Sequence, residues 1–234
     1  MITQSTAPLL ERREIAPQTY QYFFEKPDGF DFVAGQYVFL DFAQPVNRDD
    51  RPSMRALSIA SAPYEDRLMF VMRDSESAFK KNMRAMNVGD EILIKGPLGH
   101  VSIPENLHQP ITFLIAGVGI TPVRSMLKQE EHIKSFRPVT VIFSNKTKAD
   151  IVLREDMDAI SLQNFKLIHT LTREEGEWEG ARGRINAEMI KENVDDITNQ
   201  MYYVVGTGEF ITAIRDVLTE LNVPKEKIIF DNFG

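Results

Sequence analysis

Two glycines near the middle of the chain stand where a backbone could bind a phosphate. They belong to AGVGITP, residues 116–122, which follows the apolar run ITFLI and precedes a predicted helix. Gly117 and Gly119 permit a tight turn and a close approach to a pyrophosphate, whose charge is favoured by the amides and dipole of a helix N-terminus. Thr121 is suited to cap that helix and Pro122 to its first turn. Because the third glycine of the dinucleotide fingerprint is missing, a turn used only for packing stays an alternative.

A second unusual pattern lies in RALSIASAP, residues 55–63. Its Arg55, Ser58 and Ser61 follow one another at three-residue spacing among apolar residues. A half-buried strand would instead place polar residues at every second position, so period two leaves this spacing unexplained. The plainer alternative is a surface ion pair from Arg55 to one of three nearby carboxylates, Asp49, Asp50 or Glu65.

The other reactive residue types indicate no further catalytic group. Four histidines lack metal-ligand spacing and are better explained by surface or packing roles: His100, His108, His132 and His169. The chain has no cysteine, which excludes disulfides and thiolate metal sites. No Ser-His-Asp arrangement or catalytic carboxylate pair emerges, and we expect no metal.

Composition indicates a soluble globular protein. The 234 residues, 43% hydrophobic and 26% charged, suffice for one large domain or two of ordinary size. A formal charge of −7 argues against nucleic-acid binding. The N-terminus lacks the pattern of a secretory signal, and the longest apolar run, residues 111–120, is about half the length of a membrane span. We therefore expect a cytoplasmic protein without a membrane span, and predict no particular oligomeric state.

The first half of the chain favours an antiparallel β-barrel or sandwich. Short runs rich in aromatic and branched residues are separated by turn formers, and they predict strands at 20–25, 36–42, 55–61, 67–73 and 91–95. One helix is predicted at 77–86, because Phe79, Met83 and Met86 recur at helical spacing. Ser77 is its expected N-cap.

The second half instead alternates strands with helices. Strands are predicted at 111–116, 139–144, 165–171, 202–205 and 227–230, and helices at 122–132, 153–160, 187–193 and 209–221. This alternation is typical of a parallel sheet with helices on both faces. We therefore expect two domains, residues 1–104 and 105–234.

The order of these motifs resembles the ferredoxin-NADP reductase superfamily of flavoproteins along essentially the whole chain. The residues that carry the resemblance are RALSIASAP, AGVGITP and four further stretches: AGQYVFL (34–40), GDEILIKGPLG (89–99), EWEGARGRI (177–185) and VVGTGEF (204–210). The resemblance implies an N-terminal barrel that binds FAD and a C-terminal domain that binds NADH or NADPH.

The resemblance also assigns flavin-binding residues. Arg55 would pair with the flavin pyrophosphate, and Ser58 would be the catalytic residue, hydrogen-bonded near the hydride-accepting N5 of the ring. Ser61 more simply closes the strand. The remaining flavin contacts would be Ala56, Leu57, Met72, Arg73, Ser77, Ala78, Phe79 and Phe233. For Phe233, packing in the core is the alternative.

On the second domain the resemblance assigns the nicotinamide dinucleotide to residues at three turns. These residues are Gly117, Gly119, Thr121, Thr172, Arg173, Gly206, Thr207 and Gly208. A solvated loop at Thr172 and a plain strand–turn–helix at Gly206 stay as alternatives. Residues 143–156 resemble the NADH-using cytochrome reductases, and on this resemblance the expectation leans to NADH. Lys146 and Arg154 could instead attract the 2′-phosphate of NADPH electrostatically.

Three positions depart from the superfamily pattern. Leu57 stands where an aromatic residue usually stacks on the flavin, and Val205 where many members have a cysteine. The chain also ends at FDNFG, where members often continue to an aromatic residue. These departures put the redox tuning and the positioning of the nicotinamide in question.

The resemblance implies a reductase that passes hydride from NAD(P)H to FAD and then electrons to a separate acceptor. That acceptor would be a redox partner protein, such as a ferredoxin, flavodoxin or cytochrome, or a small molecule. A cluster of basic residues favours an acidic partner: Arg48, Arg51, Lys80, Lys81 and Arg84. The alternative is an electron-transfer subunit or redox-responsive binding module with little turnover of its own.

Overall fold

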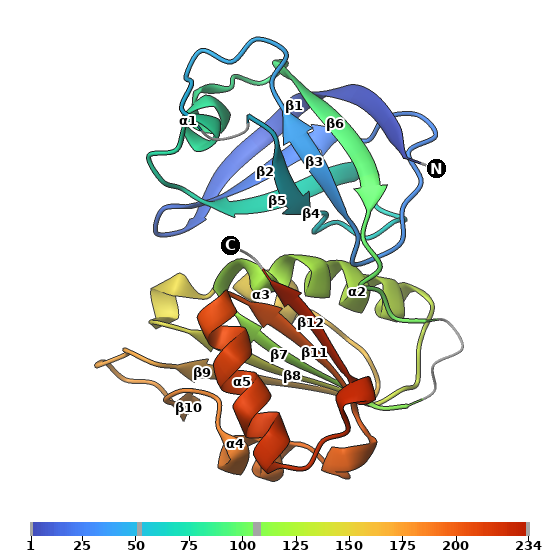
Figure 1. Cartoon of the computed structure of the whole chain (residues 1–234), viewed down its shortest axis with the longest axis vertical. Coiled ribbons are helices and arrows are strands. Elements are labelled where there is room, and N and C mark those ends of the chain that lie inside the picture. The colour runs from blue at the N-terminus through green and yellow to red at the C-terminus, as the bar shows by residue number, and fades with distance from the viewer. Residues whose placement is uncertain (1, 51–52, 105–108, 233–234) are drawn as a thin grey trace. The chain divides into compact units, whose positions relative to one another are not determined.

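The computed structural model describes residues 2–50, 53–104 and 109–232. It divides the chain into two compact units. Unit 1 comprises Met1–Ile103 together with Thr121–Gln129, and unit 2 comprises Pro104–Ile120 together with Glu130–Gly234. The elements of both units are labelled in Figure 1.

Unit 1 is built on one antiparallel sheet with strand order β4-β3-β6-β1-β2-β5. Its elements are β1 (Thr3–Ala16), β2 (Thr19–Glu25), β3 (Tyr37–Asp41), β4 (Arg55–Ser58), β5 (Arg67–Arg73), α1 (Ala78–Ala85) and β6 (Glu91–Leu98). The buried core is largely aromatic and branched, and α1 adds Phe79 and Met83 to it. Ser77 is the N-cap of α1, as predicted, and its side chain accepts a hydrogen bond from the Lys80 amide.

The two end strands of this sheet are joined by the residues that follow β4. The Ile59 amide donates to Gln36 O beside β3 (3.0 Å), and the Ala60 amide donates to Met69 O on β5 (2.8 Å). The chain therefore leaves one end of the sheet and reaches the other, which bends the sheet toward a barrel. As a result β4 ends at Ser58, and the predicted strand over 55–61 is too long.

Unit 2 contains one parallel sheet with strand order β10-β9-β8-β7-β11-β12. Its strands are β7 (Ile111–Ala116), β8 (Val139–Asn145), β9 (Phe165–Leu171), β10 (Ala181–Arg182), β11 (Met201–Gly206) and β12 (Ile228–Asn232). The α-helices of the second half of the chain are α2 (Ile120–His132), α3 (Arg154–Asp158), α4 (Ala187–Asn193) and α5 (Gly208–Glu220). Helices α4 and α5 pack on one face of this sheet (Figure 1). The predicted fold class, an antiparallel barrel followed by a parallel α/β sheet, is confirmed.

The strand order of unit 2 reverses between β7 and β11. From β7 the chain adds β8 and β9 on one side, then returns to add β11 and β12 on the other. In open parallel sheets, ligands bind at the carboxyl ends of the strands beside such a reversal. The turns that follow β7 and β11 are therefore the natural places to look for a site.

Candidate functional site

The first candidate residues lie on β4. Arg55 and Leu57 share one face of this strand: the Arg55 guanidinium lies 5.9 Å from the centre of the Phe79 ring, and Leu57 packs against the same core cluster. Ala56 is exposed, and Ser58 is buried at the last position of the strand. Because side chains alternate along a strand, Arg55 and Ser58 emerge on opposite faces. One ligand would therefore have to pass along the end of β4 to meet both.

The N-terminus of α1 carries an anion contact. The Ala78 amide donates to Asp49 Oδ2 at 2.9 Å. Beside it lies a cavity of about 360 Å³ whose lining includes Arg48, Asp49, Ala78 and Phe79. Since a carboxylate oxygen already sits on this amide, the helix start accepts a negative oxygen, as a phosphate site requires.

The other predicted flavin-binding residues of unit 1 differ in their exposure to solvent. Arg73 is exposed at the end of β5. Met72 is 5% exposed and belongs to the barrel core, so its side chain is packed within the protein. The structure thus brings Arg55, Ala78 and Phe79 together and places Met72 in the core. Phe233 lies outside the described residues.

One loop beside this cavity was not singled out from the sequence. Asn47 donates to Asn82 Oδ1 from both its backbone and side-chain nitrogens (2.8 Å each), and Asn82 Nδ2 donates back to Asn47 O (3.0 Å). These bonds hold the loop that carries Asp49 against α1. Asn82 lies on a predicted helix and Asn47 in a polar run, and neither shows a pattern that marks them as partners.

The glycine turn after β7 has one open position and one packed position. Gly117 has φ +53°, and a Cβ added there would meet no atom within 4 Å. A Cβ on Gly119 would lie only 2.7 Å from Val205 O of β11. Gly119 therefore serves close packing of the turn against β11, and Gly117 leaves backbone open to a ligand.

The prediction that Thr121 caps the following helix is wrong. Residues Gly117–Gly119 form a 3₁₀ turn, so α2 begins at Ile120 and Thr121 is its second residue. A 3₁₀ turn tightens the start of a helix and moves it toward the N-terminus. Thr121 is 3% exposed, and Pro122 still falls in the first turn.

The turn after β11 stands beside the first one, because β7 and β11 are hydrogen-bonded neighbours. Thr207 is the N-cap of α5 and accepts from the Phe210 amide at 3.4 Å. A Cβ on Gly206 would lie 2.6 Å from the Phe210 ring. Gly206, Thr207 and Gly208 therefore form a compact strand-to-helix turn at the strand-order reversal.

Thr172 and Arg173 are held to the end of β8. The Thr172 amide and hydroxyl both donate to Asn145 O (3.0 and 3.2 Å), and the Arg173 amide donates to Lys146 O (2.8 Å). Asn145 is 6% exposed, and its side-chain amide has no hydrogen-bond partner within the described part of the chain. A buried amide without partners is uncommon, and no sequence pattern marks Asn145 as a site residue.

Comparison with known proteins adds to this geometry. Residues 113–216 match the family model described as the oxidoreductase NAD-binding domain. Ferredoxin--NADP reductase B of Sorangium cellulosum is 26% identical over 239 residues, which cover 97% of this chain and 96% of that protein. NADH-cytochrome b5 reductase 2 of Yarrowia lipolytica is 31% identical over 145 residues, covering 59% of this chain and 50% of that protein.

These matches support the ferredoxin-NADP reductase superfamily that the sequence motifs indicate. Among solved structures, a ferredoxin NADP+ reductase from Neisseria gonorrhoeae with bound FAD and NADP shares the fold, with a TM-score of 0.84, 21% identity and 98% of each chain covered. The chain spans about half the length of several curated relatives that it matches.

Two titratable groups of unit 2 have pKa values shifted by burial. Burial lowers the pKa of His169, against the opposing effect of Asp158, whose Oδ1 lies 3.2 Å from His169 Nε2. Burial also raises the pKa of Asp231, which follows Phe230 on β12. Within the ranges that the structure describes, no three His, Asp or Glu side chains are close enough to hold a metal ion, and no helix could cross a membrane.

Proposed function

We propose that this chain is an NAD(P)H-dependent flavoprotein reductase, with FAD bound by unit 1 and the nicotinamide dinucleotide by unit 2. The observation that carries the proposal is the open, left-handed Gly117 at the carboxyl end of β7, where the strand order reverses. The match to a ferredoxin-NADP reductase along nearly the whole chain supports it.

The residues of unit 1 fit a flavin nucleotide. Arg55 and the Ala78 amide, with the Ser77 cap, would hold the pyrophosphate beside the 360 Å³ cavity. Ser58 would hydrogen-bond the ring edge near N5, and Leu57 would contact the ring without aromatic stacking. The chemistry would come from bound FAD, which can take two electrons from the nicotinamide and pass them to an acceptor.

Unit 2 would bind the dinucleotide at its two adjacent turns. The Gly117–Gly119 turn and the first amides of α2, Thr121 included, would face the pyrophosphate. Gly206, Thr207 and Gly208 would line the nicotinamide end, and Thr172 and Arg173 the adenosine end. The chain needs no acid or base of its own for hydride transfer, because orientation of the two reactants is its main contribution.

We expect NADH to be preferred to NADPH. Arg154 is a candidate for binding a 2′-phosphate. Its Nε forms an ion pair with Asp158 Oδ2 at 3.3 Å, and its guanidinium carbon lies 5.7 Å from the centre of the Trp178 ring. Its charge is therefore partly compensated within the protein. A ratio of kcat/KM for NADH over NADPH below one would contradict this expectation.

The electron acceptor would be a separate molecule, either a redox protein or a small molecule. In the basic cluster predicted from the sequence, Lys81 pairs with Glu76 (3.0 Å) and Arg84 pairs with Asp74. Arg51 lies outside the described residues. These pairs weaken the attraction that the cluster would exert on an acidic partner.

The test begins with purified protein incubated with FAD, whose absorption and fluorescence report binding. Mixing the flavin-loaded protein with NADH or NADPH in a stopped-flow instrument then measures flavin reduction directly. Absence of bound flavin would overturn the proposal. Rapid reduction excludes a module without turnover, and a panel of ferredoxin, flavodoxin, cytochrome and ferricyanide identifies the acceptor class.

A further inference from the structure

One helix is shared by the two units. Residues Thr121–Gln129 of α2 group with the barrel in unit 1, whereas Glu130 and the residues after it group with unit 2. The same helix directly follows the Gly117–Gly119 turn. The first half of α2, which belongs to unit 1, is therefore continuous in the chain with this turn of unit 2.

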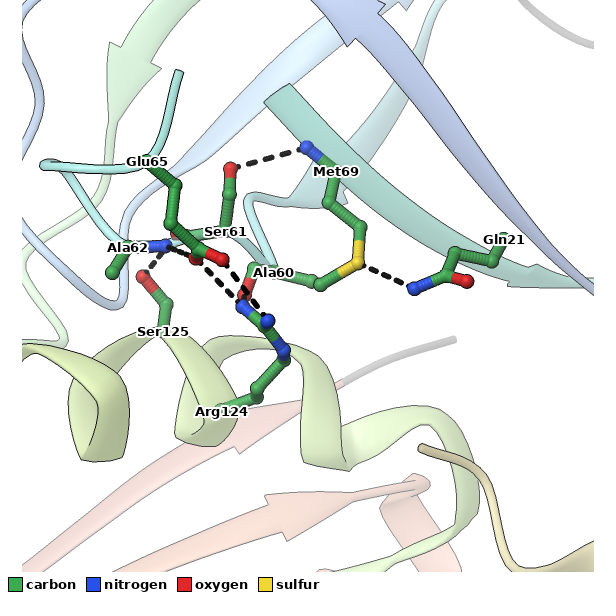
Figure 2. Close-up of polar contacts among 8 residues, drawn as sticks. All are labelled: Gln21, Ala60, Ser61, Ala62, Glu65, Met69, Arg124 and Ser125. Carbon is green, nitrogen blue, oxygen red and sulfur yellow. Dashed lines mark hydrogen bonds and ion pairs between the residues drawn. The ribbon is translucent and has the colours of Figure 1, made fainter. Parts of the chain in front are cut away.

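Arg124 makes the most extensive of these contacts. Its Nη1 donates to Glu65 Oε2 (2.7 Å) and its Nη2 to Glu65 Oε1 (3.1 Å), so the ion pair is bidentate. Nη1 also donates to the backbone oxygen of Ala60 at 2.9 Å. Figure 2 shows the guanidinium between this carbonyl and the carboxylate. Arg124 is 6% exposed, which leaves these bonds largely sheltered from water.

Residues 60–62, which contain the carbonyl that accepts from Arg124, are also held by hydrogen bonds from α2 and β5. Ser125 Oγ donates to Ser61 O at 2.6 Å, and the Met69 amide on β5 donates to Ser61 Oγ at 3.1 Å (Figure 2). Glu65 Oε2 also accepts from the Ala62 amide at 2.5 Å. Residues 60–62 are thus held between α2 and β5.

These contacts join two stretches that the proposed function assigns to different ligands. Ala60 lies two residues after Ser58, the proposed flavin contact at the end of β4. Arg124 lies five residues after Gly119, at the end of the proposed dinucleotide turn. Few rotatable backbone bonds separate the network from either stretch, so a change at Arg124 would be felt at both.

We propose that Arg124 is a positioning residue for hydride transfer. Through its bidentate pair with Glu65 and its bond to Ala60 O, it fixes the end of the flavin-binding strand to the helix that carries the dinucleotide turn. The inference rests on the proposed function. A lysine keeps the charge but cannot donate in the same plane to two carboxylate oxygens and a carbonyl, so the geometry can be tested apart from the charge.

The chain offers a matched control on the same helix. Glu130, in the last part of α2, pairs with Arg137 at 2.7 Å, and the Arg137 and Arg124 side chains are both 7% exposed. Both residues of this control pair belong to unit 2. Arg137→Lys therefore weakens a buried ion pair of α2 without touching residues 60–65.

The experiment compares Arg124→Lys with Arg137→Lys in the full-length, flavin-loaded protein. The rate constant of flavin reduction at saturating NADH is measured by stopped flow, together with FAD affinity, NADH affinity and the melting temperature. We expect Arg124→Lys to slow flavin reduction about tenfold, the effect of roughly 1.4 kcal/mol on a barrier. Both affinities should stay within about threefold of wild type, because the loss is one of orientation. Arg137→Lys should lower the melting temperature comparably and leave the rate within about twofold.

Equal slowing by the two variants, or a wild-type rate in Arg124→Lys, would overturn the inference. If Arg124→Lys does not fold, Ser125→Ala replaces it, since it removes only the hydroxyl that donates to Ser61 O. A threefold or greater loss of rate at unchanged affinities supports the inference, and an unchanged rate overturns it. A wild-type protein that binds flavin but is not reduced by NADH would instead refute the proposed function.

Discussion

Ser58 and Ser61 are the same residue type three positions apart, yet the structure gives them different surroundings. Ser58 ends β4, whereas Ser61 Oγ accepts from the buried Met69 amide. We predict that Ser58→Ala slows flavin reduction by NADH about fivefold, through loss of a hydrogen bond worth about 1 kcal/mol. Ser61→Ala should instead lower the free energy of unfolding by about 1–3 kcal/mol, because it leaves a buried amide unpaired.

The measurements are stopped-flow reduction and urea unfolding of both variants. A Ser58→Ala protein with the wild-type reduction rate would remove this residue from the proposed catalytic site. If Ser61→Ala were as slow as Ser58→Ala at equal stability, the division of roles between the two serines would be wrong.

The two glycines of the turn after β7 should also respond differently to alanine. At Gly119 a Cβ would lie 2.7 Å from Val205 O and 3.0 Å from Val205 C, so we expect Gly119→Ala to destabilise unit 2 by about 1–3 kcal/mol through overpacking. At Gly117 there is space, and only the left-handed backbone costs about 1–2 kcal/mol. The methyl group would, however, stand where the dinucleotide is proposed to bind.

Titration with NADH separates the two effects. We expect Gly117→Ala to weaken NADH binding at least tenfold while the protein stays folded. If Gly117→Ala bound NADH as tightly as wild type, the turn would have only a packing role.

At the scale of elements, the sequence predicts best where one local period decides the structure. Strands 67–73, 111–116 and 165–171 and helix 187–193 agree with β5, β7, β9 and α4 at both ends. Strand β1 was not predicted at all. Among its 14 residues only Ala7, Leu9 and Ala16 are buried, and it pairs first with β6 and then with β2. A strand that changes partners along its length shows no single alternating face.

In the candidate site too, sequence predicts the local features and misses the long-range contacts. The glycine turns and the N-cap at Ser77 can be predicted because each depends only on neighbouring residues. The ion pair between Arg124 and Glu65 joins residues 59 positions apart. Sequence reasoning named Glu65 as a possible partner of Arg55, but a carboxylate with several cations in reach gives no local sign of which it meets. Only the fold decides that question.

The edge of the second sheet offers a test by pH. His169 on β9 has a pKa lowered by burial, against the opposing contact with Asp158 on α3. The unfolded chain therefore binds a proton near pH 6.5 that the folded chain still excludes. The free energy of unfolding of unit 2 should fall as pH drops below about 6.5, until the folded-state pKa is passed.

Urea unfolding between pH 5 and 7.5, followed by Trp178 fluorescence, measures this slope. His169→Gln should flatten it, because the variant removes the buried imidazole. An equally steep slope in His169→Gln would assign the pH dependence to other groups.

At the scale of the whole molecule, helix α2 contributes residues to both units, which bears on whether the two units unfold together. The single tryptophan, Trp178, reports the unfolding of unit 2, and release of bound flavin would report unit 1. Because α2 contributes residues to both units, we expect the two signals of the wild type to change at the same urea concentration. Removing Arg124 takes the cation from the partly buried Glu65 carboxylate and a donor from Ala60 O, a loss that we put at about 3 kcal/mol.

Arg124→Gln should therefore separate the two transitions. With a urea dependence of about 2 kcal/mol per molar, loss of about 3 kcal/mol from unit 1 moves the flavin signal about 1.5 M lower, while Trp178 fluorescence moves less. Glu76→Gln breaks the exposed pair with Lys81 in the same unit, and surface pairs contribute at most about 1 kcal/mol, so its transitions should stay together. If both signals of Arg124→Gln shifted equally, the two units would unfold as one body whatever happens at Arg124, and α2 would couple them through its other contacts.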